Sequence, residues 1–443
     1  MAHTFFCPTK LIFSDDAAAD LGRELAAFGA GPALLITDAG IVATGILARL
    51  MPALTAGGRP VEVFSDVPGN PGVATVAAAL AAAQAVKPSA LVAVGGGSAI
   101  DVAKAVSVLL AHAGVTWPDL QAGRAALTGA RVPLIALPTT AGTGSEVSHV
   151  AVIGAADGFK KGIVHASLFP AAAIVDAGLA LSLPPRLTAA TGMDALVHAI
   201  EAYLGRRASP TLDLLALGAI RAIVRALPLA VAGPSTVAEP VEALTAPSTG
   251  SGRGLTTVAE PAEAPTAPST SSGRGLTTVA EPAEAPTAPS TGSGRVLAAR
   301  RELAQAAAWA GMAMDQAGLG LCHALCGPLS AHHEVHHGLG NAVLLPAVLG
   351  FNAAADGLNR PEGRWPALRH ALGLAGDAEP GALSAWATGF LTSIGLPTTL
   401  RDLGLDGATF PAIAAEATRM AMIGNNVRPA GEAECLAVLA AAL

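Results

Sequence analysis

Short apolar runs alternate with alanine-rich helical patterns over the first 180 residues, and this alternation limits the possible folds more than any other feature. The runs are ALLITD (33–38), ALVAVGGGS (90–98), VPLIALPTT (132–140) and AAIVD (172–176). Strands that are apolar throughout are buried on both faces, and strands separated by helices pair in parallel. We therefore expect an α/β domain with a parallel sheet that helices cover on both faces.

The strand signal ends near residue 180, where long helical patterns begin with LPPRLTAATGMDALVHAIEAY (183–203). A chain of 443 residues is long enough for two domains, each with its own core. We expect an α/β domain over residues 1–182 and an all-α domain over residues 183–443, with a cleft between them.

Residues 236–297 contain an internal repeat with a period of 21 residues. Its units are TVAEPVEALTAPSTGSGRGL (236–255), TVAEPAEAPTAPSTSSGRGL (257–276) and TVAEPAEAPTAPSTGSGRVL (278–297). Pro, Ser, Thr and Gly leave few apolar side chains to offset the entropy of ordering each unit, so we expect a flexible insertion between two helices. The alternative is a folded repeat domain, which normally has an apolar face in each unit.

The charge and the cysteines limit the partners and the compartment. A net charge of −7 without a Lys/Arg run argues against nucleic acid or an anionic membrane as the main partner, and favours a small molecule. The apolar stretch at 73–86 is too short for a membrane span, so we expect a buried helix there. The N-terminus lacks a secretory pattern, and four cysteines fit no disulfide framework for a chain of this size, which indicates the cytoplasm.

Two glycine-containing loops follow apolar strands and are candidates for holding a phosphate. In VAVGGGSAIDVAKAV (92–106), a helix begins near Ser98 after three glycines, which let a ligand approach the backbone and the helix start. Many strand-to-helix turns use glycine for geometry alone. A second loop, PTTAGTGSE (138–146), raises the prospect of a dinucleotide site, because the carboxyl ends of neighbouring strands meet at one edge of the sheet.

Asp38 ends the strand LLITD, where a carboxylate can accept from a ribose hydroxyl and repel a 2′-phosphate. This position favours NAD over NADP. The alternative is an ordinary solvated aspartate in a loop.

Asp194 and His198 are four residues apart, so both project from one face of a helix and can hold a divalent cation together. An ordinary hydrogen-bonded pair is the alternative. Further downstream, CHALCGPLSAHHEVHHG (322–338) holds five of the chain's eleven histidines. One unbroken helix would separate His323 from His337 by about 21 Å, so the chain must turn between them, and Gly327-Pro328 is the expected break. The residues alone leave several of these histidines as candidate ligands.

Four motifs together resemble the iron-containing (group III) alcohol dehydrogenases: GGGSAIDVAKA, PTTAGTGSE, LPPRLTAATGMDALVHAIEAY and GLGLCHAL…HHGLGNAVLLPAVLGFN. They cover nearly the whole chain outside the repeat. The resemblance implies a fold of the dehydroquinate synthase-like type, with a Rossmann-like N-terminal domain, a helical C-terminal domain and a catalytic metal in the cleft between them.

The resemblance also assigns residues to roles. The metal ligands it implies are Asp194, His198, His323 and His337, which leaves His332, His333 and His336 outside the ligand set. The cofactor-binding residues it implies are Gly95, Gly96, Gly97, Ser98 and Asp101 at the pyrophosphate, with Thr139, Thr140 and Thr143, Asn70, Lys160 and Asp38. The metal it implies is Fe²⁺, and an Asp/His₃ site can also hold Zn²⁺.

One position departs from the family pattern. Members commonly have a histidine four residues after the third ligand, facing the reaction centre, and this chain has Gly327 there. The departure puts the substrate preference and the proton path in doubt, and His332, His333 or His336 could substitute. Cys322 and Cys326 flank His323, and thiolate ligands would favour zinc. With four N/O ligands already assigned, we interpret both cysteines as packing residues.

The expected activity is hydride transfer between NAD and an alcohol, aldehyde or ketone whose oxygen is held by the metal, in a homodimer or higher homo-oligomer. Within the superfamily, the alternative is a maleylacetate-reductase-like enzyme, which reduces a C=C bond without a metal. From another class, the alternative is a catalytically silent homologue that acts as a binding protein.

Overall fold

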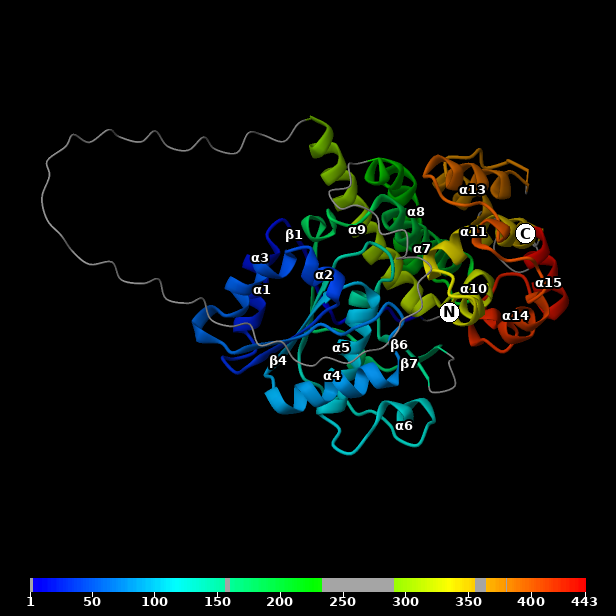
Figure 1. Ribbon diagram of the computed structural model, residues 1–443. Coiled ribbons are helices and arrows are strands. Elements are labelled where there is room, and N and C mark those ends of the chain that lie inside the picture. The colour runs from blue at the N-terminus through cyan, green and yellow to red at the C-terminus, as the bar shows by residue number, and fades with distance from the viewer. Residues whose placement is uncertain (1–2, 156–159, 233–290, 355–363, 380) are drawn as a thin grey trace, which may run out of the picture.

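The computed structural model describes residues 3–155, 160–232, 291–354, 364–379 and 381–443. Figure 1 shows two parts, an α/β part built from the N-terminal residues and a helical part built from the rest of the chain. This division agrees with the fold class expected from the sequence.

The α/β part is built on a six-stranded sheet in which every pair of neighbours is parallel, in the order β1-β8-β5-β4-β2-β3. The strands are β1 (Lys10–Ser14), β2 (Ala33–Ile36), β3 (Val61–Phe64), β4 (Ala90–Gly95), β5 (Leu134–Pro138) and β8 (Ala172–Asp176). The four predicted strands are therefore confirmed, and β1 and β3 are added to them. A separate antiparallel pair consists of β6 (Val150–Gly154) and β7 (Lys160–Val164).

Helices cover both faces of this sheet, as its apolar strands require. Neighbouring residues of a strand point to opposite faces, so Leu34 packs in the core beneath α4 and α5, while Leu35 packs in the core beneath α1 and α3. The helices of this part are α1 (Ala17–Ala26), α2 (Ala39–Ala43), α3 (Ile46–Leu54), α4 (Val73–Val86), α5 (Gly97–Leu110) and α6 (Trp117–Gln121). The predicted helix at 73–86 is α4, which buries one face through Val76, Ala79 and Ala83.

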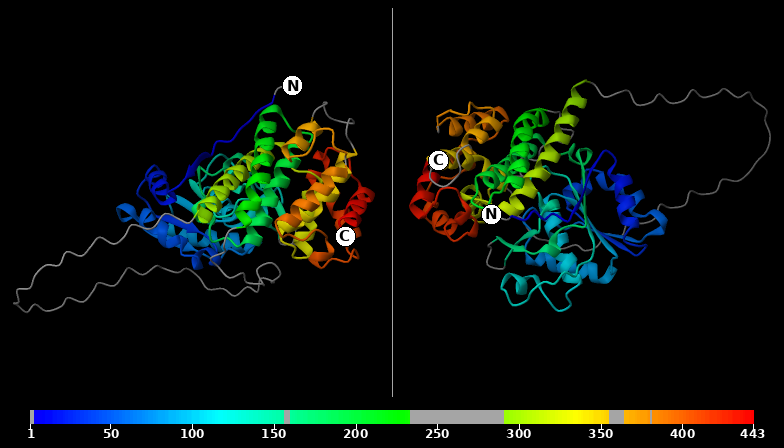
Figure 2. Two further views of the ribbon diagram at one scale, coloured as in Figure 1. Left: turned by 90° about the horizontal axis from the view of Figure 1, so that it is seen from above. Right: turned by 180° about the vertical axis from the view of Figure 1, so that it is seen from behind.

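The helical part contains α7 (Pro185–Leu204), α8 (Pro210–Val231), α9 (Thr291–Ala317), α10 (Leu321–His332), α11 (His337–Ala353), α12 (Arg364–Ala371), α13 (Gly381–Ser393), α14 (Phe410–Ala417) and α15 (Glu432–Ala441). Figure 2 shows α8 and α9 side by side, and both pack against α7. Among the described helices, α8 is the one that is long and apolar enough to cross a membrane, and it contributes Ile220 and Ile223 to the core.

The predicted repeat insertion lies mostly outside the described residues. Helix α9 begins at Thr291, so residues 291–297 of the predicted insertion are helical instead. Buried residues follow shortly afterwards at Ala299 and Leu303, where α9 packs into the helical core. The expected flexibility of the rest of the repeat stays a prediction.

The first residues of the chain lie against the helical part before they enter the sheet. The backbone N–H of Phe6 donates to the side-chain oxygen of Gln316 at 3.0 Å, and the amide of Gln316 donates back to the carbonyl of Phe6 at 2.8 Å. Figure 2 shows this N-terminal segment beside α8. The two parts are therefore joined by the N-terminal segment as well as by the connection between β8 and α7.

Candidate metal centre and cofactor loops

Asp194, His198, His323 and His337 come from three helices of the helical part, α7, α10 and α11, and their side chains lie close together. Figure 1 labels the three helices. The Asp194 Oδ1 atom lies 3.9 Å from Nε2 of His198, 3.6 Å from Nε2 of His323 and 3.8 Å from Nε2 of His337. Asp194, His198 and His323 are buried, whereas the His337 side chain is 39% exposed. The only solvent-exposed edge of this ligand set is therefore at His337.

The spacing of these atoms fits one small divalent cation. Bonds of about 2.1 Å in a tetrahedral site place ligand atoms about 3.4 Å from one another. The ligand atoms of Asp194, His323 and His337 all lie within 4.8 Å of one another. His198 is not part of this group, although its Nε2 atom lies 3.9 Å from Asp194 Oδ1. One carboxylate and three imidazoles form a donor set that both Fe²⁺ and Zn²⁺ accept.

Close helix packing brings the ligands together. Asp194 and His198 share one face of α7, and the His198 and His323 rings stack with centroids 4.7 Å apart. Gly338 follows His337 directly, and a Cβ atom built on it would lie 2.3 Å from the carbonyl oxygen of Ala190 on α7. Only glycine therefore lets α11 approach α7 closely enough to place His337 beside Asp194.

The predicted break at Gly327-Pro328 was wrong. Helix α10 continues through both residues to His332, and the chain reverses direction at residues 333–336. Glu334 takes the left-handed backbone conformation in this turn, with φ at +53°. Pro328 removes one backbone hydrogen bond from the helix. Buried residues before and after it, such as Leu325 and Leu329, hold the helix continuous.

Glu201 is a buried carboxylate that sequence reasoning missed. It lies on α7, seven residues after Asp194, and its Oε2 atom accepts from Nδ1 of His323 at 2.7 Å. It also accepts from the backbone N–H groups of Gly320 at 2.8 Å and Cys322 at 2.6 Å. A carboxylate on the outer ring nitrogen fixes the orientation and tautomer of a metal-binding histidine. The helical spacing from Asp194 was the sequence signal that could have identified Glu201.

The buried ionisable groups of this site shift one another's pKa values. Burial alone would raise the pKa of Asp194, but the neighbouring His198 and His337 outweigh it and hold this pKa well below its ordinary value. Burial alone would lower the pKa of His323, but Glu201 and Asp194 outweigh it and raise this pKa to about 9. Burial lowers the pKa of His198, against the opposing effect of Asp194. Asp194 is therefore ionised near neutral pH, as a metal ligand must be.

The two cysteines beside His323 pack as interpreted from the sequence. Cys322 and Cys326 are fully buried, and the Cys322 thiol donates to the carbonyl oxygen of Asn341 at 3.3 Å. The Cys326 thiol donates to the carbonyl oxygen of His337 at 3.2 Å. Burial raises the pKa of the Cys322 thiol well above its ordinary value, so this residue remains a neutral packing group.

The space beside Gly327 is filled by a methionine. A Cβ atom built on Gly327 would lie 2.8 Å from the terminal methyl group of Met420. Since Gly327 lies one helical turn after His323, Met420 presents an apolar group next to the ligand set. His332 instead pairs with Glu416, with Nε2 and Oε2 2.9 Å apart, and its side chain is 42% exposed.

The two glycine-containing loops meet at the carboxyl edge of the sheet, after the neighbouring strands β4 and β5. A Cβ atom on Gly97 would lie 2.9 Å from the methyl group of Thr143, and one on Gly96 would lie 3.5 Å from the methyl group of Thr140. Glycine is therefore needed at 97 for the loops to touch. This juxtaposition of a helix start and hydroxyl groups is suited to a dinucleotide phosphate.

Asp38 follows β2 on the other side of β4 and approaches the same edge. Its Oδ1 atom accepts from the backbone N–H of Ile41 at 2.9 Å, and its Oδ2 atom would lie 3.3 Å from a Cβ atom on Gly95. Burial raises the pKa of Asp38. The Ser98 hydroxyl donates to the carbonyl oxygen of Gly69 at 2.8 Å, which ties the loop containing Asn70 to the start of α5.

Two other predicted cofactor residues, Asp101 and Thr139, make contacts within the α/β part, and the cofactor role of Lys160 stays a prediction. Asp101 is buried on α5 and accepts from the backbone N–H of Val152 at 2.9 Å, so its contacts hold β6 against α5. Thr139 is buried and its backbone N–H donates to the carbonyl of Gly95 at 3.0 Å, linking β5 to β4. Lys160 begins β7, and its side chain lies outside the described residues.

The second loop also contacts the helix that carries Asp194 and His198. A Cβ atom on Gly142 would lie 2.8 Å from both the Cβ and the carbonyl oxygen of Thr191, which is on α7, one turn before Asp194. The candidate cofactor loop and the candidate metal centre are therefore adjacent, at the junction of the two parts of the molecule.

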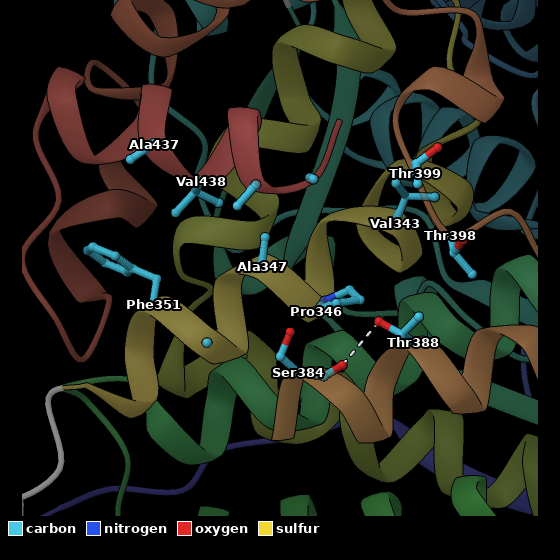
Figure 3. Close-up of a pocket in the computed structure, with 13 residues that line it drawn as sticks. Val343, Pro346, Ala347, Phe351, Ser384, Thr388, Thr398, Thr399, Ala437 and Val438 are labelled. Carbon is cyan, nitrogen blue, oxygen red and sulfur yellow. Dashed lines mark hydrogen bonds between the residues drawn. The ribbon is translucent and has the colours of Figure 1, made fainter. Parts of the chain in front are cut away.

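A cavity of about 470 Å³ lies elsewhere, among α11, α13, α15 and the loop at residues 398–399 (Figure 3). Apolar groups such as Val343, Ala347 and Phe351 line it, and its polar groups are hydroxyls such as that of Thr388, which donates to the carbonyl oxygen of Ser384. The residues lining this cavity include no charged or titratable side chain, so it lacks the groups needed for acid–base or metal chemistry.

Comparison with known families gives two matches that together span most of the chain. The family model described as iron-containing alcohol dehydrogenase matches residues 8–177. The model described as the C-terminal domain of the Fe-containing alcohol dehydrogenase family matches residues 188–250 and 284–443.

Curated relatives are similar over nearly their full length. A probable alcohol dehydrogenase, EutG, of Salmonella typhimurium is 32% identical over 440 residues, covering 99% of this chain and 94% of the relative. The 4-hydroxybutyrate dehydrogenase of Cupriavidus necator is 33% identical over 404 residues, covering 90% and 88%.

Solved structures share the fold. A 1,3-propanediol oxidoreductase matches with a TM-score of 0.80 and 29% identity, covering all of both chains. A sulfoacetaldehyde reductase from Bifidobacterium kashiwanohense, solved in complex with NAD⁺, matches with a TM-score of 0.78 and 26% identity, covering 100% of this chain and 98% of the other.

Proposed function

Because this chain belongs to the iron-containing alcohol dehydrogenase family, we propose that it transfers a hydride between NAD and an alcohol, or the corresponding aldehyde or ketone. The observation that carries the proposal is the convergence of Asp194, His198, His323 and His337 next to a loop suited to a dinucleotide.

The four convergent side chains would hold one divalent cation, whose chemistry when bound is to polarise a carbonyl oxygen or stabilise an alkoxide, lowering the barrier by several kcal/mol. Glu201 keeps His323 oriented with Nε2 directed to the centre. Because the other ligands are buried, the substrate and its proton reach the centre past His337, which is the ligand with an exposed edge. We assign iron to the site on the basis of the family, with zinc as the competing ion.

The carboxyl edge of the sheet would hold the dinucleotide. The loops at Gly95–Ser98 and Thr139–Thr143 would bind its pyrophosphate, and Asp38 would accept from a ribose hydroxyl. A carboxylate at Asp38 repels a 2′-phosphate, which supports NAD rather than NADP. The contact of Gly142 with Thr191 supports placing the nicotinamide end near α7.

The test is turnover by the full chain before and after metal loading. Metal-free protein is loaded with Fe²⁺ or Zn²⁺, and NADH oxidation is followed by absorbance with a panel of short aldehydes, including those of diols and hydroxy acids. We expect turnover only in loaded protein, and we expect D194N to lose both metal binding and turnover. The matched control is H332A, which removes an exposed histidine of α10 outside the ligand set and should keep both.

Two results would refute the proposal. Absence of both bound metal and turnover would favour a silent homologue that acts as a binding protein. Reduction of an activated C=C bond by metal-free protein would favour a maleylacetate-reductase-like enzyme.

We also propose a homo-oligomer in the cytoplasm with small molecules, rather than nucleic acids or membranes, as ligands. The strand β1 lies at the edge of the sheet, and Phe13 on it is 46% exposed. An edge strand has backbone groups that can pair with another chain. Light scattering of the full chain and of F13K tests this proposal, and a monomeric wild type would refute it.

A further inference from the structure

The side-chain amide of Asn341 contacts three of the candidate metal ligands. Its Nδ2 atom lies 2.8 Å from Oδ1 of Asp194, 3.0 Å from Nε2 of His323 and 3.2 Å from Nε2 of His337. One amide nitrogen therefore faces three of the four atoms that would hold a cation. His198 is not among these contacts, so the amide caps the face formed by the other three.

The charge of Asp194 determines which end of the amide faces the ligands. If the amide were turned over, its oxygen would lie against the Asp194 carboxylate at the 2.8 Å distance now occupied by the nitrogen. Two acceptors at this separation repel each other, whereas an N–H group donates to the carboxylate. Asn341 is therefore a donor to Asp194.

The cost of this arrangement indicates that the contact has a role. Asn341 is fully buried, and its Oδ1 atom has no hydrogen-bond partner among the described residues. A buried polar atom without a partner costs about 1–3 kcal/mol. An apolar residue of similar size would avoid this cost, so packing alone does not explain an asparagine at this position.

We propose that Asn341 is a positioning residue of the metal centre. Its amide donates to the Asp194 oxygen that faces the histidines, which fixes the orientation of this carboxylate while leaving a second lone pair of the same oxygen for a cation. This inference rests on the proposed metal centre but adds a residue to it, because hydrogen bonds to a ligating carboxylate tune metal affinity. Asn341 is one helical turn after His337, so both project from the same face of α11.

The experiment measures metal affinity rather than turnover. Metal-free wild type, N341L and N352L are titrated with Co²⁺ against a competing chelator, and the visible bands of bound Co²⁺ are recorded. Asn352 is the matched control because it is also buried on α11, and its amide contacts Asn426 instead of the metal ligands. The thermal midpoint of each metal-free protein is measured in parallel.

We expect N341L to bind Co²⁺ about 10–100-fold more weakly than the wild type, with shifted visible bands. N352L should lower the thermal midpoint and retain wild-type Co²⁺ affinity. If N341L does not fold, N341S provides the same comparison, because the smaller serine side chain adds no bulk and has no amide to reach Asp194.

Wild-type affinity and spectrum in N341L or N341S would overturn the inference. An equal loss of affinity in N352L would also overturn it, because the effect would then be a general loosening of α11. Failure of the wild type itself to bind Co²⁺ would count against the proposed metal centre and would thus be distinguished from failure of the role assigned to Asn341.

Discussion

Replacing Glu201 with glutamine tests whether one buried carboxylate maintains the geometry of the metal centre. Glu201 accepts three hydrogen bonds, two at Oε2 and one at Oε1. Glutamine keeps the shape but has only one carbonyl oxygen. If that oxygen takes the place of Oε2, the new NH₂ group faces the N–H group of Cys322, and one hydrogen bond to a charged acceptor is lost.

The magnitude follows from the structure by two routes. Losing one hydrogen bond to a charged group costs about 1.5–3 kcal/mol. The second route is the pKa of His323, which is raised from an ordinary 6.5 to about 9, chiefly by Glu201 acting against burial. A shift of this size corresponds to about 3 kcal/mol. Both routes describe overlapping interactions, so we expect E201Q to destabilise the metal-free protein by about 3 kcal/mol rather than by their sum.

The loss should depend on pH in a defined direction. A histidine with a raised pKa in the folded state stabilises the fold fully below its ordinary pKa, and this stabilisation disappears as the pH rises through the folded value. The deficit of E201Q should therefore be larger at about pH 6 than at about pH 10, where His323 is neutral in both proteins.

The assay is urea unfolding of the metal-free proteins followed by circular dichroism. The matched control is E416Q, because Glu416 also contacts a histidine of α10, His332, whose side chain is 42% exposed. We expect that control to cost less than about 1 kcal/mol. An E201Q protein as stable as E416Q, or with a deficit independent of pH, would refute the role assigned to Glu201.

Three further predictions concern other sites. Burial raises the pKa of Glu146 to about 6, so its stabilising contribution is present below its ordinary pKa of 4.5 and is lost as the pH rises through 6. E146Q should remove about 2 kcal/mol of pH-dependent stability between these values, and an unchanged pH profile in urea unfolding would contradict this. In Gly97→Ala, the new methyl would meet Thr143 at 2.9 Å, so NADH affinity measured by fluorescence should fall, and wild-type affinity would show that the loop contact is not needed. Gly327→His should lower stability by about 1–3 kcal/mol because Met420 occupies the space. Adding M420A should restore the thermal midpoint, and an unrestored midpoint would show that Met420 is not the obstacle.

The sequence predicted the features that depend on local periodicity. Apolar strands such as the one at 90–95 were predicted correctly, because a parallel sheet buries both faces of its strands and therefore requires continuous apolar runs. The pairing of Asp194 with His198 was visible because residues four apart share a helix face. The turn between His323 and His337 was misplaced, because the local rule that proline ends a helix was overridden by the burial of α10 in the tertiary structure.

The sequence by itself determined which helices and strands form and which side chains share a face of a helix or strand. Both follow from the spacing of apolar residues, compared with the number of residues per helical turn or strand repeat. Only the tertiary structure decided which groups from different helices meet. Gly338 lies against Ala190 so that α11 can approach α7, and the contacts of Glu201 and Asn341 with His323 follow from this packing. Distances between helices are set by close packing of the whole core, so sequence spacing alone could not specify these contacts.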